Sequence, residues 1–164
     1  MASIKNLCVV IPAKDEEKSI GEIIKGCKKY AERVLVIDGY SKDKTREIAE
    51  KSGVGVVLQK GKGKGAAIRT SAEHVSNDEI VVFIDADGSH DPDDIPKLIK
   101  PIQDGKADHV TGSRLFGGSS ELHGGFDEFM RLTGSSFITF CIKEFYHFEI
   151  ISFYGHIYQI NIIT

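Results

Sequence analysis

The 164-residue sequence predicts an α/β domain with a mostly parallel sheet flanked by helices. Short β-branched runs recur along the chain, and segments with helical periodicity separate them. This alternation is typical of parallel strands, because parallel neighbours need a long crossover connection. Unusual polar motifs follow the runs, so they are expected at the carboxyl edge of the sheet, where ligands of such sheets bind.

The expected strands are runs of mostly apolar residues: LCVVIP (7–12), RVLVID (33–38), VGVVLQ (54–59), EIVVFID (79–85) and ADHVTG (107–112). If their spatial order is 3-2-1-4, as in the first half of a doubly wound sheet, the order reverses between the first and fourth strands. That reversal would set Pro12 to Glu16 beside Asp85 and Asp87.

Helices are expected between these strands. Two have an apolar stripe at the spacing i, i+3, i+4, i+7, which is typical of amphipathic helices packed on a sheet. The stripes consist of Ile20, Ile23, Ile24 and Cys27 in one helix and of Ile95, Leu98, Ile99 and Ile102 in the other. The segment TREIAEKSG is expected to end a third helix at Gly53, and GAAIRTSAEHV (65–75) has a thinner stripe of Ile68, Ala72 and Val75.

The composition, 41% apolar and 27% charged, suits one domain with one core. A net charge of −3 gives no basic excess, so nucleic acid is not expected as a partner. Cys8, Cys27 and Cys141 lack metal-ligand spacing and are expected to be buried free thiols in a reducing compartment. The first residues lack a signal-peptide layout, which favours a cytoplasmic location.

An unusual group of acids follows the fourth strand in FIDADGSHDPDD. Asp91 precedes Pro92 and two further acids, a pattern typical of a helix N-cap and first turn. Asp85 and Asp87 stand two positions apart at the expected strand end, so their side chains would project to one side and repel. A Mg²⁺ or Mn²⁺ ion that also binds substrate phosphate would remove this repulsion. The alternative is a pair of solvated loop aspartates.

The glycine-lysine stretch GKGKG (61–65) matches neither a Walker loop nor a dinucleotide-binding fingerprint. It is either a solvated turn or a phosphate contact made by Lys64 or Arg69. His74 and His90 are expected at the surface or at helix ends, without a functional role.

Five segments, in chain order, resemble the nucleotide-sugar-binding half of the GT-A inverting glycosyltransferases: VVIPAKDEEKSI, VLVIDGYSKDKT, GKGKGAAIR, VVFIDADGSHDPDDIPKLI and ADHVTGSR. The resemblance is strongest to the dolichyl-phosphate mannose synthase and polyprenyl-phosphate glucosyltransferase group. It covers residues 6–116 and continues more weakly to about residue 142. It implies a Rossmann-like GT-A sheet, in a domain that is either whole or incomplete.

The resemblance also implies roles for individual residues. Asp87 and Arg114 are the expected catalytic residues, Arg114 through contact with phosphate. The other ligand-binding residues that it implies are Pro12, Ala13 and Glu16 at the nucleoside, Asp38 at the base or ribose, Asp85, Asp87 and Ser89 at the metal and diphosphate, and Arg131 and Ser135 at the acceptor phosphate. Lys64 is added as a substrate-binding residue on the GKGKG stretch alone.

The sequence departs from the family pattern at three places. Lys14 and Asp15 replace a frequent Tyr-Asn in the first motif. The second motif is often Asp-Asp-Gly-Ser and is here Asp38-Gly39-Tyr40-Ser41, so that Tyr40 takes the usual glycine position. Ser89 stands where many relatives have Gln.

The resemblance implies a metal-dependent, inverting transfer of a hexose from GDP-mannose or UDP-glucose to dolichyl or polyprenyl phosphate. Acids in PAKDEE argue against a dinucleotide-dependent oxidoreductase, because they would repel a pyrophosphate. Two alternatives stay open: a haloacid-dehalogenase-type phosphatase, whose D-x-D-G-[TS] motif resembles DADGS, and a donor-binding domain without complete catalytic machinery. The position of DADGS after the fourth strand, not the first, argues against the phosphatase.

We therefore expect residues 1–142 to form the nucleotide-sugar-binding domain, with a helix around 127–142, and residues 143–164 to form an apolar tail that matches no known motif. The uncharged run 150–164 falls short of the roughly 20 apolar residues that span a bilayer, so contact with the cytoplasmic face of a membrane would be peripheral. Apolar surface left on the domain would be covered by the tail or by a second copy in a homodimer.

Overall fold

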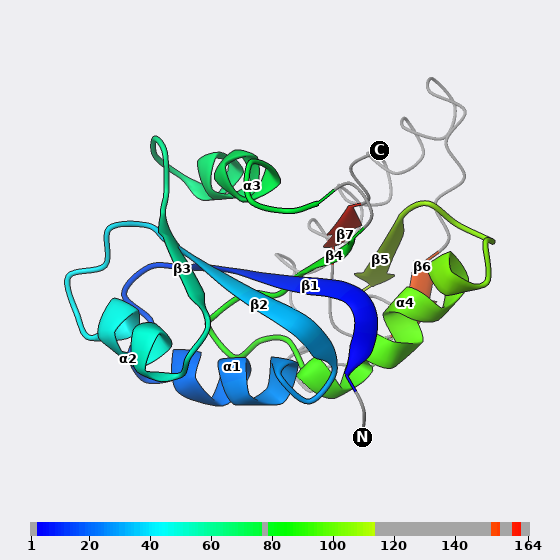
Figure 1. Cartoon of the computed structure of the whole chain (residues 1–164), viewed down its shortest axis with the longest axis horizontal. Helices are drawn as coiled ribbons and strands as arrows, with labels where there is room; N and C mark the ends of the chain where they lie inside the picture. The colour runs from blue at the N-terminus through cyan, green and yellow to red at the C-terminus, as the bar shows by residue number, and fades with distance from the viewer. Residues whose placement is uncertain (1–2, 77–78, 114–151, 155–158, 162–164) are drawn as a thin grey trace, which may run out of the picture.

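The computed structural model describes residues 3–76, 79–113, 152–154 and 159–161. Its strands form a seven-stranded sheet in the order β3-β2-β1-β4-β7-β5-β6, with helices packed on both faces (Figure 1). The elements are β1 (Ile4–Ala13), α1 (Ile20–Cys27), β2 (Ala31–Asp38), α2 (Thr45–Lys51), β3 (Gly55–Leu58), α3 (Lys64–Ala72), β4 (Ile80–Phe83), the 3₁₀ turn η1 (Pro92–Asp94), α4 (Ile95–Gln103), β5 (Val110–Ser113), β6 (Ser152–Tyr154) and β7 (Gln159–Asn161).

The first four strands are parallel neighbours in the predicted order 3-2-1-4. β1 is an interior strand, and its residues Leu7 to Ile11 are fully buried, as expected for a strand covered on both faces. Val9 pairs with Val34 of β2 on one side and with Val82 of β4 on the other. The strand order therefore reverses between β1 and β4, which confirms the expected doubly wound arrangement.

Alternate residues of β1 supply two separate cores. Val9 and Ile11 pack in one core with side chains of α1, α2 and α4, whereas Cys8 and Val10 pack in the other with Ala67 of α3. Figure 1 shows this division, with α3 on one face of the sheet and the other three helices on the opposite face. The two cores cover both faces of β1.

The far half of the sheet includes two short strands from residues 143–164. β7 lies between β4 and β5 and is antiparallel to both, and β6 is parallel to β5. The sheet is thus mostly parallel, as predicted, with an antiparallel strand inserted. The expected helix at 127–142 and Cys141 lie outside the described residues. None of the helices that the structure describes is long and apolar enough to cross a membrane.

The apolar stripe of α1 is buried as predicted, and so are most of the residues in the stripe of α4. In α3 the prediction was partly wrong, because Ala72 is exposed. The helix instead buries four small residues: Ala66, Ala67, Thr70 and Ser71. Small side chains allow a close approach to the sheet, and the two hydroxyls donate to carbonyl oxygens of the same helix, at 2.8 and 2.7 Å.

Gly26 of α1 lies against Pro92 of η1. A Cβ atom at Gly26 would stand 2.7 Å from Pro92 Cγ, well inside van der Waals contact. We therefore expect Gly26→Ala to lower the free energy of unfolding by about 1–3 kcal/mol, the usual cost of overpacking. Urea denaturation would measure it.

Gly21→Ala is the matched control in the same helix. Its Cβ would meet Ile48 Cγ2 at an ordinary 3.5 Å, so the variant should be neutral or slightly more stable through its higher helix propensity. Equal stabilities of the two variants would contradict the proposed clash.

Candidate functional site

The loops after β1 and β2 hold each other by reciprocal hydrogen bonds. The backbone N–H of Asp15 donates to Ser41 Oγ at 3.0 Å, and the backbone N–H of Lys42 donates to Asp15 Oδ1 at 2.7 Å. The two loops are 26 or 27 residues apart in the chain, yet each supplies donors and acceptors to the other. This exchange fixes the position of one loop against the other at the carboxyl edge of the sheet.

Glu17 makes a second exchange of the same kind. Its backbone N–H donates to Asp43 Oδ2 at 3.0 Å, and its carboxylate accepts from the backbone N–H of Lys44 at 3.1 Å. Between the two exchanges, the N–H of Glu16 donates to Thr45 Oγ1 at 2.7 Å. Two acids of the first motif, Asp15 and Glu17, thus bind the neighbouring loop.

Asp38 ends β2 and closes the turn that follows. Its side chain is only 2% exposed, and Oδ1 accepts from the backbone N–H of Ser41 at 3.3 Å. The N–H of Gly39 donates to the carbonyl of Ala13 at 2.8 Å, which ties the turn to the end of β1. The described contacts of the Asp38 carboxylate are therefore made within the turn, and a contact with base or ribose remains a prediction.

The first loop also touches the loop after β4. Ser19 Oγ donates to the carbonyl oxygen of Ala86 at 2.6 Å and lies 3.4 Å from Glu16 Oε2. Ala86 is the residue between Asp85 and Asp87, so the expected approach of the two motifs at the strand-order reversal is confirmed. Glu16 is half-buried at this junction.

The loop after β4 carries the pair of aspartates. β4 ends at Phe83, earlier than the sequence suggested, so Asp85 and Asp87 lie in the loop and not at the end of the strand. The side chain of Asp85 is 26% exposed, and its Oδ1 lies 2.5 Å from Lys64 Nζ, in an ion pair. Lys64 is the first residue of α3 and comes directly after the GKG turn. The structure therefore joins this loop to the loop after β3.

Asp87 is exposed and ionised. Burial would raise the pKa of its carboxyl, but hydrogen bonds from the side chain and backbone of Ser89 outweigh that effect and hold the pKa below its usual value. The backbone N–H of Ser89 donates to Asp87 Oδ1 at 2.9 Å. Ser89 thus stabilises the ionised form of Asp87. Its contact with a metal stays a prediction.

Among the residues that the structure describes, no group of three His, Cys, Asp or Glu side chains could hold a metal by itself. Two carboxylates nevertheless fit Mg²⁺ or Mn²⁺, because these ions usually take one or two protein carboxylates and complete their shell with water and phosphate oxygens. Asp85 and Asp87 are such a pair. Lys64 supplies the positive charge beside Asp85 in the structure.

His90 is buried and stands directly before Asp91, the N-cap of η1, so of its two predicted positions the helix end applies and the surface does not. It is 7% exposed, and its Nδ1 accepts from the backbone N–H of Asp85 at 3.0 Å, while Nε2 lies 4.0 Å from Asp85 Oδ2. Gly88, with φ of 83°, lies in the turn that joins Asp85 to His90. An accepting Nδ1 places the proton of the neutral ring on Nε2. His90 therefore fixes the backbone at Asp85.

Gln59, directly after β3, is a second residue that the sequence analysis missed. Its buried side-chain amide donates to the carbonyl oxygens of Gly61 and Gly63, at 2.9 and 3.2 Å. These bonds shape the turn from which Lys64 reaches Asp85. A glutamine two positions before GKGKG was a visible signal, but its partners are local carbonyls that a sequence pattern does not reveal.

The remaining predicted residues divide into two groups. Pro12 and Ala13 lie at the end of β1, half-buried and buried, beside the loops already described. Arg114, Arg131 and Ser135 lie outside the described residues. The predicted N-cap is confirmed, since Asp91 Oδ1 accepts from the backbone N–H of Asp93 at 2.9 Å.

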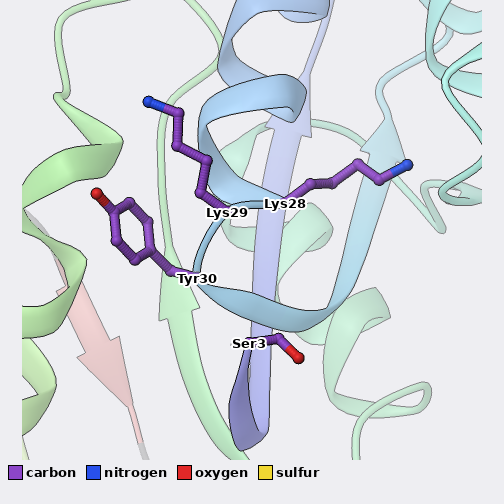
Figure 2. Close-up of a pocket in the computed structure, with 4 residues that line it drawn as sticks. All are labelled: Ser3, Lys28, Lys29 and Tyr30. Atoms are coloured by element: carbon purple, nitrogen blue, oxygen red, sulfur yellow. The ribbon is translucent and has the colours of Figure 1, made fainter. Parts of the chain in front are cut away.

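A surface hollow at the other end of β1 is lined by Ser3, Lys28, Lys29 and Tyr30 (Figure 2). Its two lysines extend in different directions and already have partners in the chain. Lys28 Nζ donates to the carbonyl of Ser52 at 2.9 Å, and Lys29 Nζ lies 3.2 Å from a carboxylate oxygen of η1. This hollow is remote from the carboxyl edge and is not part of the candidate site.

Comparisons with known proteins agree with this arrangement. A glycosyltransferase from Haloferax volcanii named AglJ is 38% identical over 110 residues, which cover 66% of this chain and 36% of that protein. The UDP-N-acetylglucosamine–dolichyl-phosphate N-acetylglucosaminyltransferase of Methanococcus voltae is 29% identical over 163 residues, covering 87% of this chain and 65% of that protein. The chain spans 36% to 52% of the length of the first curated relatives that it matches.

Solved structures give the same result. Glucosyl-3-phosphoglycerate synthase from Mycobacterium tuberculosis, in complex with Mn²⁺, uridine diphosphate and glucosyl-3-phosphoglycerate, superposes with a TM-score of 0.60 and 29% identity. The superposition covers 66% of this chain and 43% of that one. The GT-A fold predicted from the sequence is thereby confirmed. The model of the family described as glycosyl transferase family 2 matches residues 8–159, and the chain belongs to that family.

Proposed function

We propose that this chain binds a nucleotide sugar together with Mg²⁺ or Mn²⁺ at the carboxyl edge of β1 and β4, and that its hexose is transferred with inversion to a polyprenyl or dolichyl phosphate. The observation that carries the proposal is the position of Asp85 and Asp87 at the strand-order reversal, beside the first loop and Lys64. Ligands of open α/β sheets bind at this point.

Relatives support both substrates. The name of the Methanococcus voltae relative states that it acts on UDP-N-acetylglucosamine and dolichyl phosphate, and the Mycobacterium tuberculosis structure contains Mn²⁺ and uridine diphosphate. A uridine donor is therefore favoured over a guanosine donor. We further propose that residues 1–142 form the donor-binding unit and that the protein works at the cytoplasmic face of a membrane.

In this proposal Asp85 and Asp87 hold the metal, which supplies positive charge where the diphosphate leaves. Lys64 adds a second cation at the diphosphate, and His90 keeps the backbone of Asp85 in place. The two interlocked loops present Pro12, Ala13, Glu16 and Asp38 to the nucleoside. These roles require little movement, because the loops are already fixed by their mutual hydrogen bonds.

Arg114, Arg131 and Ser135 are proposed to bind phosphate on the acceptor side of the site. A phosphomonoester acceptor has a second pKa of about 6 and is already anionic near neutral pH. It needs no general base from the chain, in contrast to a sugar hydroxyl. In this proposal Asp85 and Asp87 are assigned to the metal, so neither is needed as a general base.

Calorimetric titration of the full chain with UDP and with GDP, in Mn²⁺ and in EDTA, tests the donor site. Metal-dependent binding of a nucleoside diphosphate is expected, and labelled hexose should pass from the nucleotide sugar to a short polyprenyl phosphate with inverted configuration. Equal binding in EDTA would remove the metal from the proposal. Steady hydrolysis of an aryl phosphate, with an aspartyl-phosphate on Asp85, would reverse the assignment in favour of a phosphatase.

A further inference from the structure

Tyr40 has a backbone conformation that disfavours its side chain. Its φ is +62°, in the left-handed region, and the other described non-glycine residues with positive φ are Asn6 and Asp15. Asparagine and aspartate tolerate this region through local hydrogen bonds, whereas a bulky aromatic residue there is an outlier. The glycine that the resembled family often has at this position would adopt the conformation without strain.

Packing does not account for the tyrosine. Tyr40 is 58% exposed, the largest exposed fraction among the large apolar side chains of the described residues. Burial of its ring therefore contributes little to the stability of the fold. Strained residues that neither packing nor backbone preference explains are concentrated at binding sites and active sites.

The turn that carries Tyr40 is held on both sides. Asp38 Oδ1 accepts from the N–H of Ser41, Ser41 Oγ accepts from the N–H of Asp15, and Gly39 donates to Ala13. A Cβ atom on Gly39 would already meet Lys14 Cβ at 3.2 Å and Ala13 O at 3.3 Å, so the turn has little room to relax. The network holds the turn that bears the exposed ring, two residues beyond Asp38, against the end of β1.

We propose that Tyr40 contacts the donor directly, with its ring stacked on the nucleobase of the nucleoside diphosphate. This inference rests on the proposed function, because it needs a nucleotide at the edge of β1 and β2. An aromatic ring suits a base because both present flat, polarisable faces, and such stacking is tolerant of base identity. The strain at Tyr40 is then retained for binding, with a cost to the stability of the fold.

Tyr40→Asn separates the two effects, because asparagine accepts a positive φ and cannot stack in the same way. The variant should bind UDP and GDP about tenfold more weakly in Mn²⁺, within the range for loss of one stacked base. Its Tm should rise by a few degrees, because the strain is relieved. Affinity for inorganic pyrophosphate with Mn²⁺ should not change, since pyrophosphate has no base.

Tyr40→Phe is the matched control, because it keeps the ring and the strain while it removes only the hydroxyl. It should retain nearly all of the affinity for UDP and show no gain in Tm. Undiminished affinity of Tyr40→Asn for both nucleotides, or an equal loss of affinity for pyrophosphate, would overturn the stacking role. The proposed function would stand in either case. Failure of the unmodified chain to bind either nucleotide would overturn this inference and the proposed function together.

Discussion

Asp87→Ala should abolish metal-dependent binding of a nucleoside diphosphate and lower hexose transfer by about 10²–10³-fold or more, the scale seen when one preorganised electrostatic contact is removed. The carboxylate of Asp87 is exposed and kept ionised by its hydrogen bonds with Ser89, so it is suited to bind a cation. The variant would keep one carboxylate of the pair, that of Asp85, which is already bound to Lys64. The fold should be unaffected, because no core side chain contacts depend on an exposed loop carboxylate. Titration with Mn²⁺ and UDP, with circular dichroism as a check on folding, measures the effect.

Asp93→Ala provides the control for this experiment. Asp93 belongs to the same acid-rich stretch, but its carboxylate binds Lys29 and Tyr30, which holds its pKa below the usual value. Because these are exposed surface contacts that solvent screens, its loss should lower stability only slightly and leave nucleotide affinity unchanged. Mn²⁺-dependent affinity that survives in Asp87→Ala would remove the metal site from the proposal.

The parallel half of the fold could be predicted because its signals are local. The run from Leu7 to Ile11 is uninterrupted in apolar character, as a strand buried on both faces requires, and the stripe of Ile20, Ile23, Ile24 and Cys27 repeats at the helical period. Once five strands and their crossovers are recognised, the carboxyl edge follows from chain direction alone. The meeting of the first loop with the loop after β4 then depends on strand order, which was assumed from the usual doubly wound arrangement.

Other features depend on contacts between distant residues and have no local pattern. The hydrogen bond between Asp15 and Ser41 joins two loops 26 residues apart in the chain. No pattern near either residue in the sequence predicts its partner. The three-residue strand β7 enters between β4 and β5 from the end of the chain, where the sequence showed only an apolar tail. Hydrophobic periodicity also misled in α3, because alanine, threonine and serine are buried there by close approach and not by apolar character.

The acidic first motif illustrates the same limit. From the sequence, its acids were interpreted as groups that would repel a pyrophosphate, and the resemblance gave Glu16 a contact with the nucleoside. In the structure, Asp15 and Glu17 accept hydrogen bonds from backbone N–H groups of the next loop. Their charge thus supports the geometry of the site, whereas Glu16, between them, remains half-buried at the junction with the loop after β4. Residue type alone did not distinguish these two uses.

The ion pair between Lys64 and Asp85 leads to a second prediction with a large effect. A lysine ammonium 2.5 Å from Asp85 Oδ1 opposes a divalent cation at the same carboxylate. When a diphosphate is present, the ammonium gains an anionic partner and the opposition falls. Lys64→Met should therefore bind Mn²⁺ alone more tightly, yet bind UDP with Mn²⁺ about tenfold more weakly, a change of about 1.4 kcal/mol. The modest size reflects the 62% exposure of the lysine side chain, since solvent screens such pairs.

The Lys64→Met experiment is decisive because the two affinities should change in opposite directions, tighter for Mn²⁺ alone and weaker for UDP with Mn²⁺. A lysine that only stabilised the turn would, on removal, weaken Mn²⁺ and UDP binding together, because both need the loop near Asp85. Lys62→Met, on the same exposed loop, controls for a general loss of positive charge and should change neither affinity appreciably. Calorimetry of Mn²⁺ binding with and without saturating UDP gives both quantities from one sample. If Lys64→Met leaves the affinity for Mn²⁺ alone unchanged or lower, the lysine does not compete with the cation, and the coupling between metal and nucleotide must arise from the phosphate oxygens alone.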